Sequence, residues 1–145
     1  HKDDGFLIDA LEEQGKRYGL DTAKNFEPNR WLTDGDQIEI DGEKLDVYHC
    51  PGHTPGHIIF FHDQSQLAVV GDVIFQGSIG RSDLPRGNHE ELVNSIVNRL
   101  WPLGDNMTFI PGHGATWDIF GVLDLMPEGP RTKVDIFRDQ LLLRG

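Results

Sequence analysis

The chain has 145 residues, of which 37% are hydrophobic, and this length fits one domain with a core of its own. Lysine and arginine number 13 against 24 aspartate and glutamate residues, and the net charge of −11 excludes the basic surface that nucleic acid or an anionic membrane would bind. No stretch approaches the roughly 20 apolar residues of a membrane span. The one cysteine, Cys50, excludes an internal disulfide and fits a reducing compartment, so we expect a cytoplasmic protein.

The first elements along the chain are predicted to be a helix and a hairpin. Apolar residues recur at helical spacing across residues 3–19, behind acidic residues, and Gly19 marks a suitable end. Residues 37–40 and 43–50 alternate apolar and polar side chains around Asp41-Gly42. An Asp-Gly pair between alternating runs is the strongest short signal for a β-hairpin.

The rest of the chain continues as a mixture of strands and helices. Residues 57–63 and 66–75 are β-type runs separated by a turn, and residues 107–110 predict another short strand. Residues 89–101 place apolar side chains on one side of a helix. Residues 133–144 predict a terminal helix. The fold class is therefore α/β in the broad sense of mixed α and β elements.

A loop of prolines and glycines, "CPGHTPGHIIFF" at residues 50–61, holds two histidines four residues apart. Proline fixes φ and glycine allows positive φ, so Pro51-Gly52 and Pro55-Gly56 predict a shaped loop and not a helix face. Such a loop can aim His53 at a site.

Three polar residues lie directly next to the ends of predicted strands. Binding and catalytic residues often occupy such positions. His53 precedes the run "HIIFF", Asp72 follows "LAVVG", and His113 follows "TFIPG". Two imidazoles and a carboxylate together suit zinc or iron, whereas calcium and magnesium prefer oxygen ligands alone. Taken singly, each has an ordinary interpretation as a surface histidine or a turn residue.

The remaining candidates are interpreted as structural. Cys50 is expected to be a small buried hydrophobic residue, and His57 to orient the loop by a hydrogen bond. The other histidines fall on predicted strands or at the start of a helix, namely His49, His62 and His89.

Three ordered motifs give the chain a family resemblance. "CPGHTPGHIIFF", "VVGDVIFQGSIGRSDLPRGN" and "TFIPGHG" resemble successive motifs of the metallo-β-lactamase superfamily, and within it the glyoxalase II-like bacterial hydrolases. The resemblance covers residues 1–114 and implies an αββα sandwich with two metal ions at one edge. It implies that His53 binds the first metal, that Asp72 bridges both, and that His113 binds the second.

The chemistry that the resemblance implies is hydrolysis of a thioester such as S-lactoylglutathione by a metal-bound hydroxide, with Asp72 as the central catalytic and metal-binding residue. The metal is expected to be zinc, with iron or manganese as alternatives. His57 matches a family histidine that steadies the loop. A related branch, the persulfide dioxygenases, uses one iron, and "GRSD" at residues 80–83 is compatible with both branches.

The sequence also departs from the family pattern. The signature H-x-H-x-D-H should precede this region, but no two histidines here are two residues apart. Because this signature is missing, we expect a later part of the fold, with the first strands absent and with weak or absent metal binding. The first residue, His1 and not methionine, also fits a part of a longer product. Residues 115–145 do not match the family.

Two hypotheses of different class follow. The chain is either a truncated, inactive hydrolase or a non-catalytic remnant that serves as a homo-oligomeric structural or interaction module. In both, missing strands would leave an apolar face of the sheet uncovered. We expect a second copy to cover it as a homodimer, with the tail around Trp117, Ile119, Phe120 and Leu123 as the alternative cover.

Overall fold

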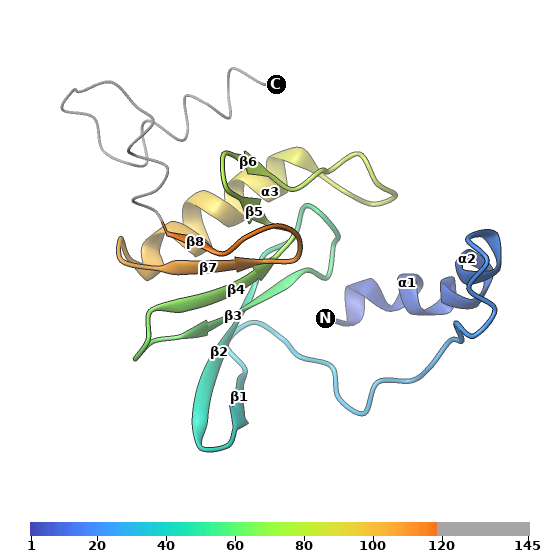
Figure 1. Ribbon diagram of the computed structural model, residues 1–145, viewed down its shortest axis with the longest axis horizontal. Coiled ribbons are helices and arrows are strands. Elements are labelled where there is room, and N and C mark those ends of the chain that lie inside the picture. The colour runs from blue at the N-terminus through green and yellow to red at the C-terminus, as the bar shows by residue number, and fades with distance from the viewer. Residues whose placement is uncertain (119–145) are drawn as a thin grey trace.

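The computed structural model describes residues 1–118 (Figure 1). Within this part no helix is long and apolar enough to cross a membrane. The predicted terminal helix, residues 133–144, and most of the proposed tail cover lie outside the described residues. The helical segments are η1 (Lys2–Asp4), α1 (Gly5–Asp9), α2 (Leu11–Arg17), α3 (His89–Ser95), η2 (Ile96–Leu100) and η3 (Trp101–Leu103). The strands are β1 (Gln37–Ile40), β2 (Glu43–His49), β3 (Ile58–His62), β4 (Leu67–Gly71), β5 (Ile74–Phe75), β6 (Ser78–Ile79), β7 (Thr108–Pro111) and β8 (Trp117–Asp118).

The main sheet has six strands in the order β1-β2-β3-β4-β7-β8, and β5 and β6 form a small second sheet. Strands β1 to β4 pair antiparallel, starting with the hairpin predicted at Asp41-Gly42, where both residues have positive φ. β7 runs parallel to β4, with α3 in the connection between them. The carboxyl ends of β4 and β7 and the start of β3 therefore lie at the same edge of the sheet, which we call the site edge.

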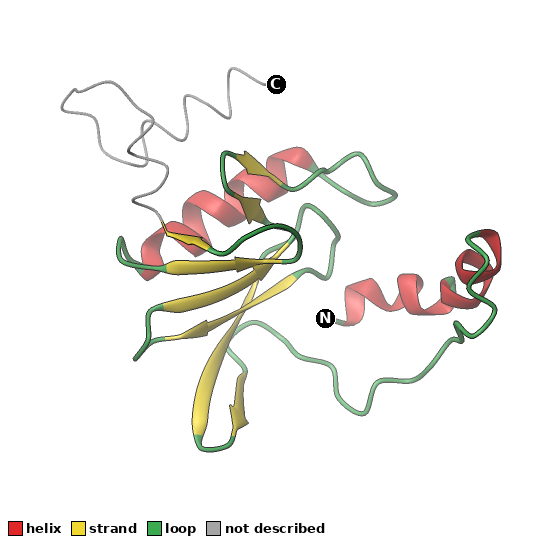
Figure 2. Ribbon diagram, in the orientation of Figure 1, coloured by secondary structure: helices red, strands yellow, loops and turns green. Residues whose placement is uncertain are grey.

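Helix α3 and its continuation η2 cover one face of the sheet (Figure 2). The Asn88 side chain caps the helix by accepting from the Glu91 N–H at 3.2 Å, as expected of a residue that starts a helix. Apolar side chains from both layers are fully buried between them. They include Ile59, Ala68, Val70 and Phe109 from the strands and Leu92, Ile96 and Leu100 from the helix. This face carries the core.

The helix predicted for residues 3–19 is broken at Ala10, between α1 and α2. At the break the Asn25 side chain donates to the Asp9 carbonyl at 2.6 Å and accepts from the Glu12 N–H at 2.9 Å. These bonds satisfy backbone groups that a continuous helix would pair internally. The break therefore depends on a residue outside the helical segment.

The strand predicted for residues 66–75 is also divided. β4 ends at Gly71, whose φ of +52° lies in the left-handed region, and the chain resumes as β5 in the second sheet. A Cβ on Gly71 would lie 2.8 Å from Nε2 of His57, so the backbone turns where this imidazole packs. The turn brings Asp72 out of the strand direction.

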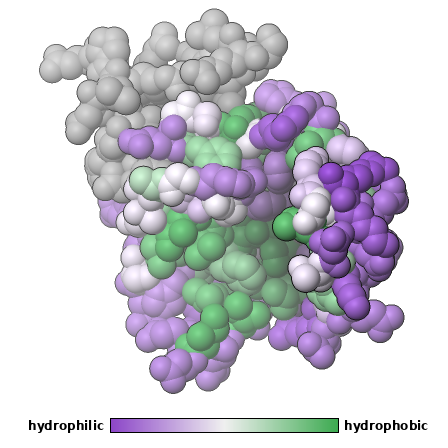
Figure 3. All heavy atoms as spheres, turned by 45° about the vertical axis from the view of Figure 1, so that its right-hand side comes forward, coloured by the Kyte–Doolittle hydropathy of each residue, from purple (hydrophilic) through white to green (hydrophobic). Residues whose placement is uncertain are grey.

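The side of the sheet that faces away from α3 is apolar as well, and we call it the outer face. The strand register places Val47, Phe60, Val69 and Ile110 side by side across β2, β3, β4 and β7 on this face. Val47 is 1% exposed, whereas Val69 is 37% exposed. Figure 3 shows a broad hydrophobic area on the surface of the molecule. Part of the outer face is therefore left uncovered by the described residues.

Candidate metal centre

His53 lies in the loop between β2 and β3. The residue before it, Gly52, has a backbone conformation and surroundings that only glycine permits. Gly52 has a φ of +133°, and a Cβ there would lie 2.2 Å from the backbone nitrogen of Leu92. The carbonyl of Gly52 accepts a hydrogen bond from the Asn88 N–H at 2.7 Å. The loop is thus pressed against the first turn of α3, which fixes the direction of His53.

Asp4 holds the second half of the same loop. Its carboxylate accepts from the Thr54 hydroxyl and from the Gly56 N–H, each at 2.7 Å. The two groups lie 50 and 52 residues away in the sequence. Sequence reasoning missed this role because the local pattern around Asp4 indicates only an acidic helix start.

The three predicted ligands lie together at the site edge. Nε2 of His53 is 3.5 Å from Oδ2 of Asp72, and Nδ1 of His113 is 3.0 Å from Oδ1 of the same carboxylate. The side chains of His53 and Asp72 are 14% and 23% exposed, whereas that of His113 is 78% exposed. Each imidazole therefore faces a different oxygen of Asp72, and one side of the site is open to solvent.

The hydrogen bond that His53 makes through Nδ1 determines whether its Nε2 carries a proton or a lone pair. Nδ1 lies 2.8 Å from the carbonyl oxygen of Arg81. A carbonyl oxygen can only accept, so Nδ1 carries the proton, and Nε2 of the neutral ring presents a lone pair toward the Asp72 carboxylate. A lone pair and an anion repel unless a proton or a metal cation lies between them. The donor set of two imidazoles and a carboxylate fits zinc or iron in that position.

Arg81 also explains part of the "GRSD" motif. Its guanidinium donates two hydrogen bonds to the Asp83 carboxylate, at 2.9 and 2.7 Å, and this partner lowers the pKa of Asp83 to about 2. Both side chains are exposed, so the pair adds little stability by itself. The contact with His53 comes from the backbone carbonyl of Arg81, which no side-chain pattern could have predicted.

Two glycines leave room for Asp72. A Cβ on Gly80 would lie 1.8 Å from the Asp72 carbonyl oxygen, and a Cβ on Gly112 would lie 2.3 Å from the carboxylate Oδ1. Real Cβ atoms do not approach other heavy atoms so closely. Gly80 therefore packs against the backbone of Asp72, and Gly112 packs against one oxygen of its carboxylate.

His57 packs under the site. Its Nε2 lies 3.1 Å from the Val70 carbonyl and therefore donates to it, and its ring stands edge-on to that of His53 with centroids 5.8 Å apart. Burial lowers the pKa of His57, so the neutral ring is favoured. The bond ties the loop to the end of β4, next to Asp72.

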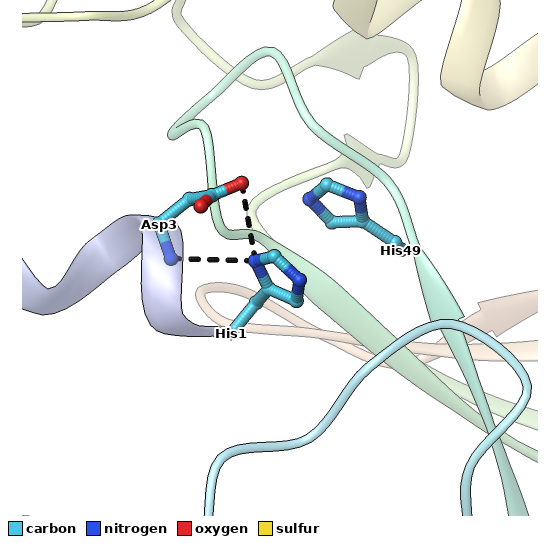
Figure 4. A group of neighbouring side chains, drawn as sticks. All are labelled: His1, Asp3 and His49. Carbon is cyan, nitrogen blue, oxygen red and sulfur yellow. Dashed lines mark hydrogen bonds and ion pairs between the residues drawn. The ribbon is translucent and has the colours of Figure 1, made fainter.

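A second group of potential ligands lies beside the same loop: His1, Asp3 and His49 (Figure 4). Within residues 1–118 it is the one group of three whose ligand atoms all lie within 4.8 Å of one another. The rings of His1 and His49 are stacked, with centroids 4.4 Å apart and planes 20° apart. Nearly parallel rings cannot both direct in-plane lone pairs at one ion, and Nε2 of His49 already donates to the Pro55 carbonyl at 2.8 Å. We interpret this group as packing that holds the N-terminal turn against the loop.

The remaining predicted residues lie away from the site. Nε2 of His62 pairs with Glu43 at 2.9 Å, and His89 opens α3. Cys50 is fully buried, and burial raises the pKa of its thiol to about 12. None of these three residues joins the group around Asp72.

Comparison with known proteins identifies the family. Residues 1–113 match the sequence family described as the metallo-beta-lactamase superfamily. The chain belongs to this superfamily. It is 46% identical over 113 residues to the hydroxyacylglutathione hydrolase GloC of Haemophilus influenzae, a match that covers 77% of this chain and 53% of that protein.

Solved structures show the same α/β fold. The chain is similar to the BLEG-1 B3 metallo-beta-lactamase with a TM-score of 0.73 and 31% identity, over 86% of this chain and 60% of that one. It is similar to TTHA1623, solved in a di-iron-bound form, with a TM-score of 0.71 and 32% identity over the same shares. The chain thus spans about half the length of the curated relative and 60% of these structures.

Proposed function

We propose that the chain carries part of the active site of a glyoxalase II-like, metal-dependent hydrolase that acts on a small-molecule thioester. The observation that carries the proposal is the shared carboxylate: Asp72 presents one oxygen to His53 and the other to His113. Similarity to a hydroxyacylglutathione hydrolase supports the thioester as the substrate class.

In this proposal His53 would hold a first metal, Asp72 both metals, and His113 a second. Zinc is the first candidate and iron or manganese the alternatives; the di-iron form of a similar protein supports iron. Bound metal ions would supply an activated water and would polarise the attacked carbonyl. The chain's own part is positional. The Arg81 carbonyl orients the His53 imidazole, and His57 ties the loop to the end of β4. Gly80 and Gly112 leave room for the Asp72 backbone and carboxylate.

We further propose that these 145 residues alone bind metal weakly and do not turn over substrate. The described residues bring three predicted ligands together, and the sequence has no H-x-H-x-D-H. We assign residues 1–114 to one part of an αββα sandwich and residues 115–145 to a tail, a division that the end of the family match at residue 113 supports. The tail begins against the sheet, because β8 pairs with β7. A free, buried Cys50 supports a cytoplasmic location.

The alternative is a non-catalytic module that keeps the family loops. The partly uncovered outer face favours this alternative, because an apolar sheet face is a surface for another polypeptide. A single-iron site of the persulfide dioxygenase type is less favoured, since the two imidazoles face different oxygens of Asp72 and do not surround one point.

Hydrolysis of S-lactoylglutathione by the zinc-supplemented chain tests this account. We expect a rate no higher than that of Asp72→Ala, with Asp63→Ala as a control outside the site. A clear rate that Asp72→Ala abolishes and Asp63→Ala retains would show an active enzyme and would overturn the proposed inactivity. A clear rate that all three proteins share would place hydrolysis away from Asp72 and would overturn the proposed site.

A further inference from the structure

We propose that Asp4 is a positioning residue of the candidate metal centre: its carboxylate holds the loop of residues 50–57 in the shape that aims His53 at Asp72. The proposal rests on the proposed function, because it takes His53 and Asp72 as metal ligands. It adds a carboxylate from the N-terminal turn η1 that acts on the loop and is not itself a predicted ligand.

Both oxygens of the Asp4 carboxylate are used by the loop. Oδ2 accepts from the Thr54 hydroxyl and Oδ1 accepts from the Gly56 N–H, each at 2.7 Å. Gly56 is buried, and a Cβ on it would lie 2.6 Å from Cγ of Asp4. Hydrogen bonds to an ionised acceptor are roughly twice as strong as those between neutral groups. The carboxylate and the loop therefore fit closely and are held together by two strong bonds.

His53 lies between two supports of this loop. On one side the Gly52 carbonyl accepts from the Asn88 N–H at 2.7 Å, which ties the loop to α3. On the other side the Thr54 hydroxyl is held by Asp4. The Gly52 N–H also donates to the Thr54 carbonyl at 3.0 Å, so a displacement of Thr54 reaches the backbone on both sides of His53. Loss of Asp4 should therefore loosen the loop without removing a ligand.

Other residues of the N-terminal segment keep it against the same part of the molecule. The His1 ring stacks on that of His49, and Nε2 of His49 donates to the Pro55 carbonyl at 2.8 Å (Figure 4). The guanidinium of Arg86 lies over the Phe6 ring, 4.2 Å from its centroid. These contacts do not use the Asp4 carboxylate. We therefore expect the segment to stay in place when that carboxylate is removed.

Weaker metal binding is the expected consequence of losing Asp4. Residues that orient metal ligands typically contribute about ten- to a hundredfold in affinity. Asp4→Ala should therefore bind zinc at least about tenfold more weakly than the unaltered chain, or not detectably. Asp4→Asn separates position from charge, because its amide oxygen can accept from the Gly56 N–H and its amide nitrogen can donate to the Thr54 hydroxyl. We expect Asp4→Asn to retain most of the affinity.

Zinc titration by calorimetry and amide hydrogen exchange of the zinc-free chain test the proposal together. For Asp4→Ala we expect weaker zinc binding and faster exchange of the Gly52 amide, whose acceptor is the Thr54 carbonyl. Asp9→Ala is the matched control: it removes an exposed carboxylate from the same segment and should match the unaltered chain in both measurements. Circular dichroism establishes that each variant is folded, and Thr54→Val, which removes one of the two bonds, replaces Asp4→Ala if the latter is not.

Three results overturn the positioning role. The first is a folded Asp4→Ala chain that binds zinc like the unaltered chain, and the second is unchanged exchange of the Gly52 amide. The third is an equal loss of affinity in Asp4→Asn and Asp4→Ala, because charge and not position then explains the loss. Failure of the proposed metal centre gives a different result, since Asp72→Ala would then bind zinc as tightly as the unaltered chain.

Discussion

Gly112→Ala should reduce metal affinity at Asp72 without unfolding the chain. An added Cβ would stand 2.3 Å from Oδ1 of Asp72, whereas an ordinary contact is about 3.4 Å or more, so the carboxylate must move by about 1 Å. Metal ligands tolerate only about 0.2 Å of displacement. We expect at least a tenfold loss of zinc affinity, or about 1.4 kcal/mol. Gly112 itself is exposed, so the fold should survive.

Isothermal titration with zinc measures the effect, and Gly114→Ala is the matched control from the same loop. Gly114 has a φ of +83°, so alanine strains the backbone there, but nothing lies within 4 Å of its Cβ position. The control should bind zinc more tightly than Gly112→Ala. If Gly112→Ala binds like the unaltered chain, or if Gly114→Ala loses as much, the close contact with Asp72 is not what orients the carboxylate.

Three further predictions concern stability and reactivity. Gly52→Ala should lower the free energy of unfolding by more than about 3 kcal/mol, because its Cβ would meet the backbone of Leu92 at 2.2 Å; a denaturant midpoint close to the original would refute this. Asn25→Ala should cost about 1 kcal/mol by removing two hydrogen bonds at the helix break, with no change in melting as the opposing result. Cys50 should react with a thiol reagent only after unfolding. Fast labelling of the folded chain would argue against burial. Burial also raises the pKa of the Cys50 thiol in the folded chain to about 12, so the unfolded chain loses this proton at a lower pH. The free energy of unfolding should therefore fall as the pH rises above about 9.

Local sequence pattern predicted the strands and the hairpin well. Asp41-Gly42 has the positive φ angles that this pair favours, and the helix at residues 89–101 buries its apolar side. The pattern failed where a distant residue decides the backbone. The predicted helix over residues 3–19 is broken because Asn25 bonds to its middle, and strand β4 stops at Gly71 beside His57.

The candidate site likewise contains residues that the local sequence indicates and residues that it does not. The sequence indicated three site residues because each lies next to the end of a predicted strand: His53, Asp72 and His113. The sheet topology brings those strand ends to one edge. Asp4 and the Arg81 carbonyl could not be chosen. Asp4 acts across 50 residues, and Arg81 acts through its backbone, which carries no side-chain signal.

The most direct test of the account is a zinc titration of the 145-residue chain, followed by elemental analysis after dialysis. We predict weak binding of at most one ion, at either side of the Asp72 carboxylate. Asp72→Ala should reduce it most, because both positions use this carboxylate, His53→Ala and His113→Ala should each reduce it in part, and His62→Ala, whose imidazole pairs with Glu43, should leave it unchanged. Two tightly held ions would contradict the account, and so would binding that depends on His62 as much as on His53.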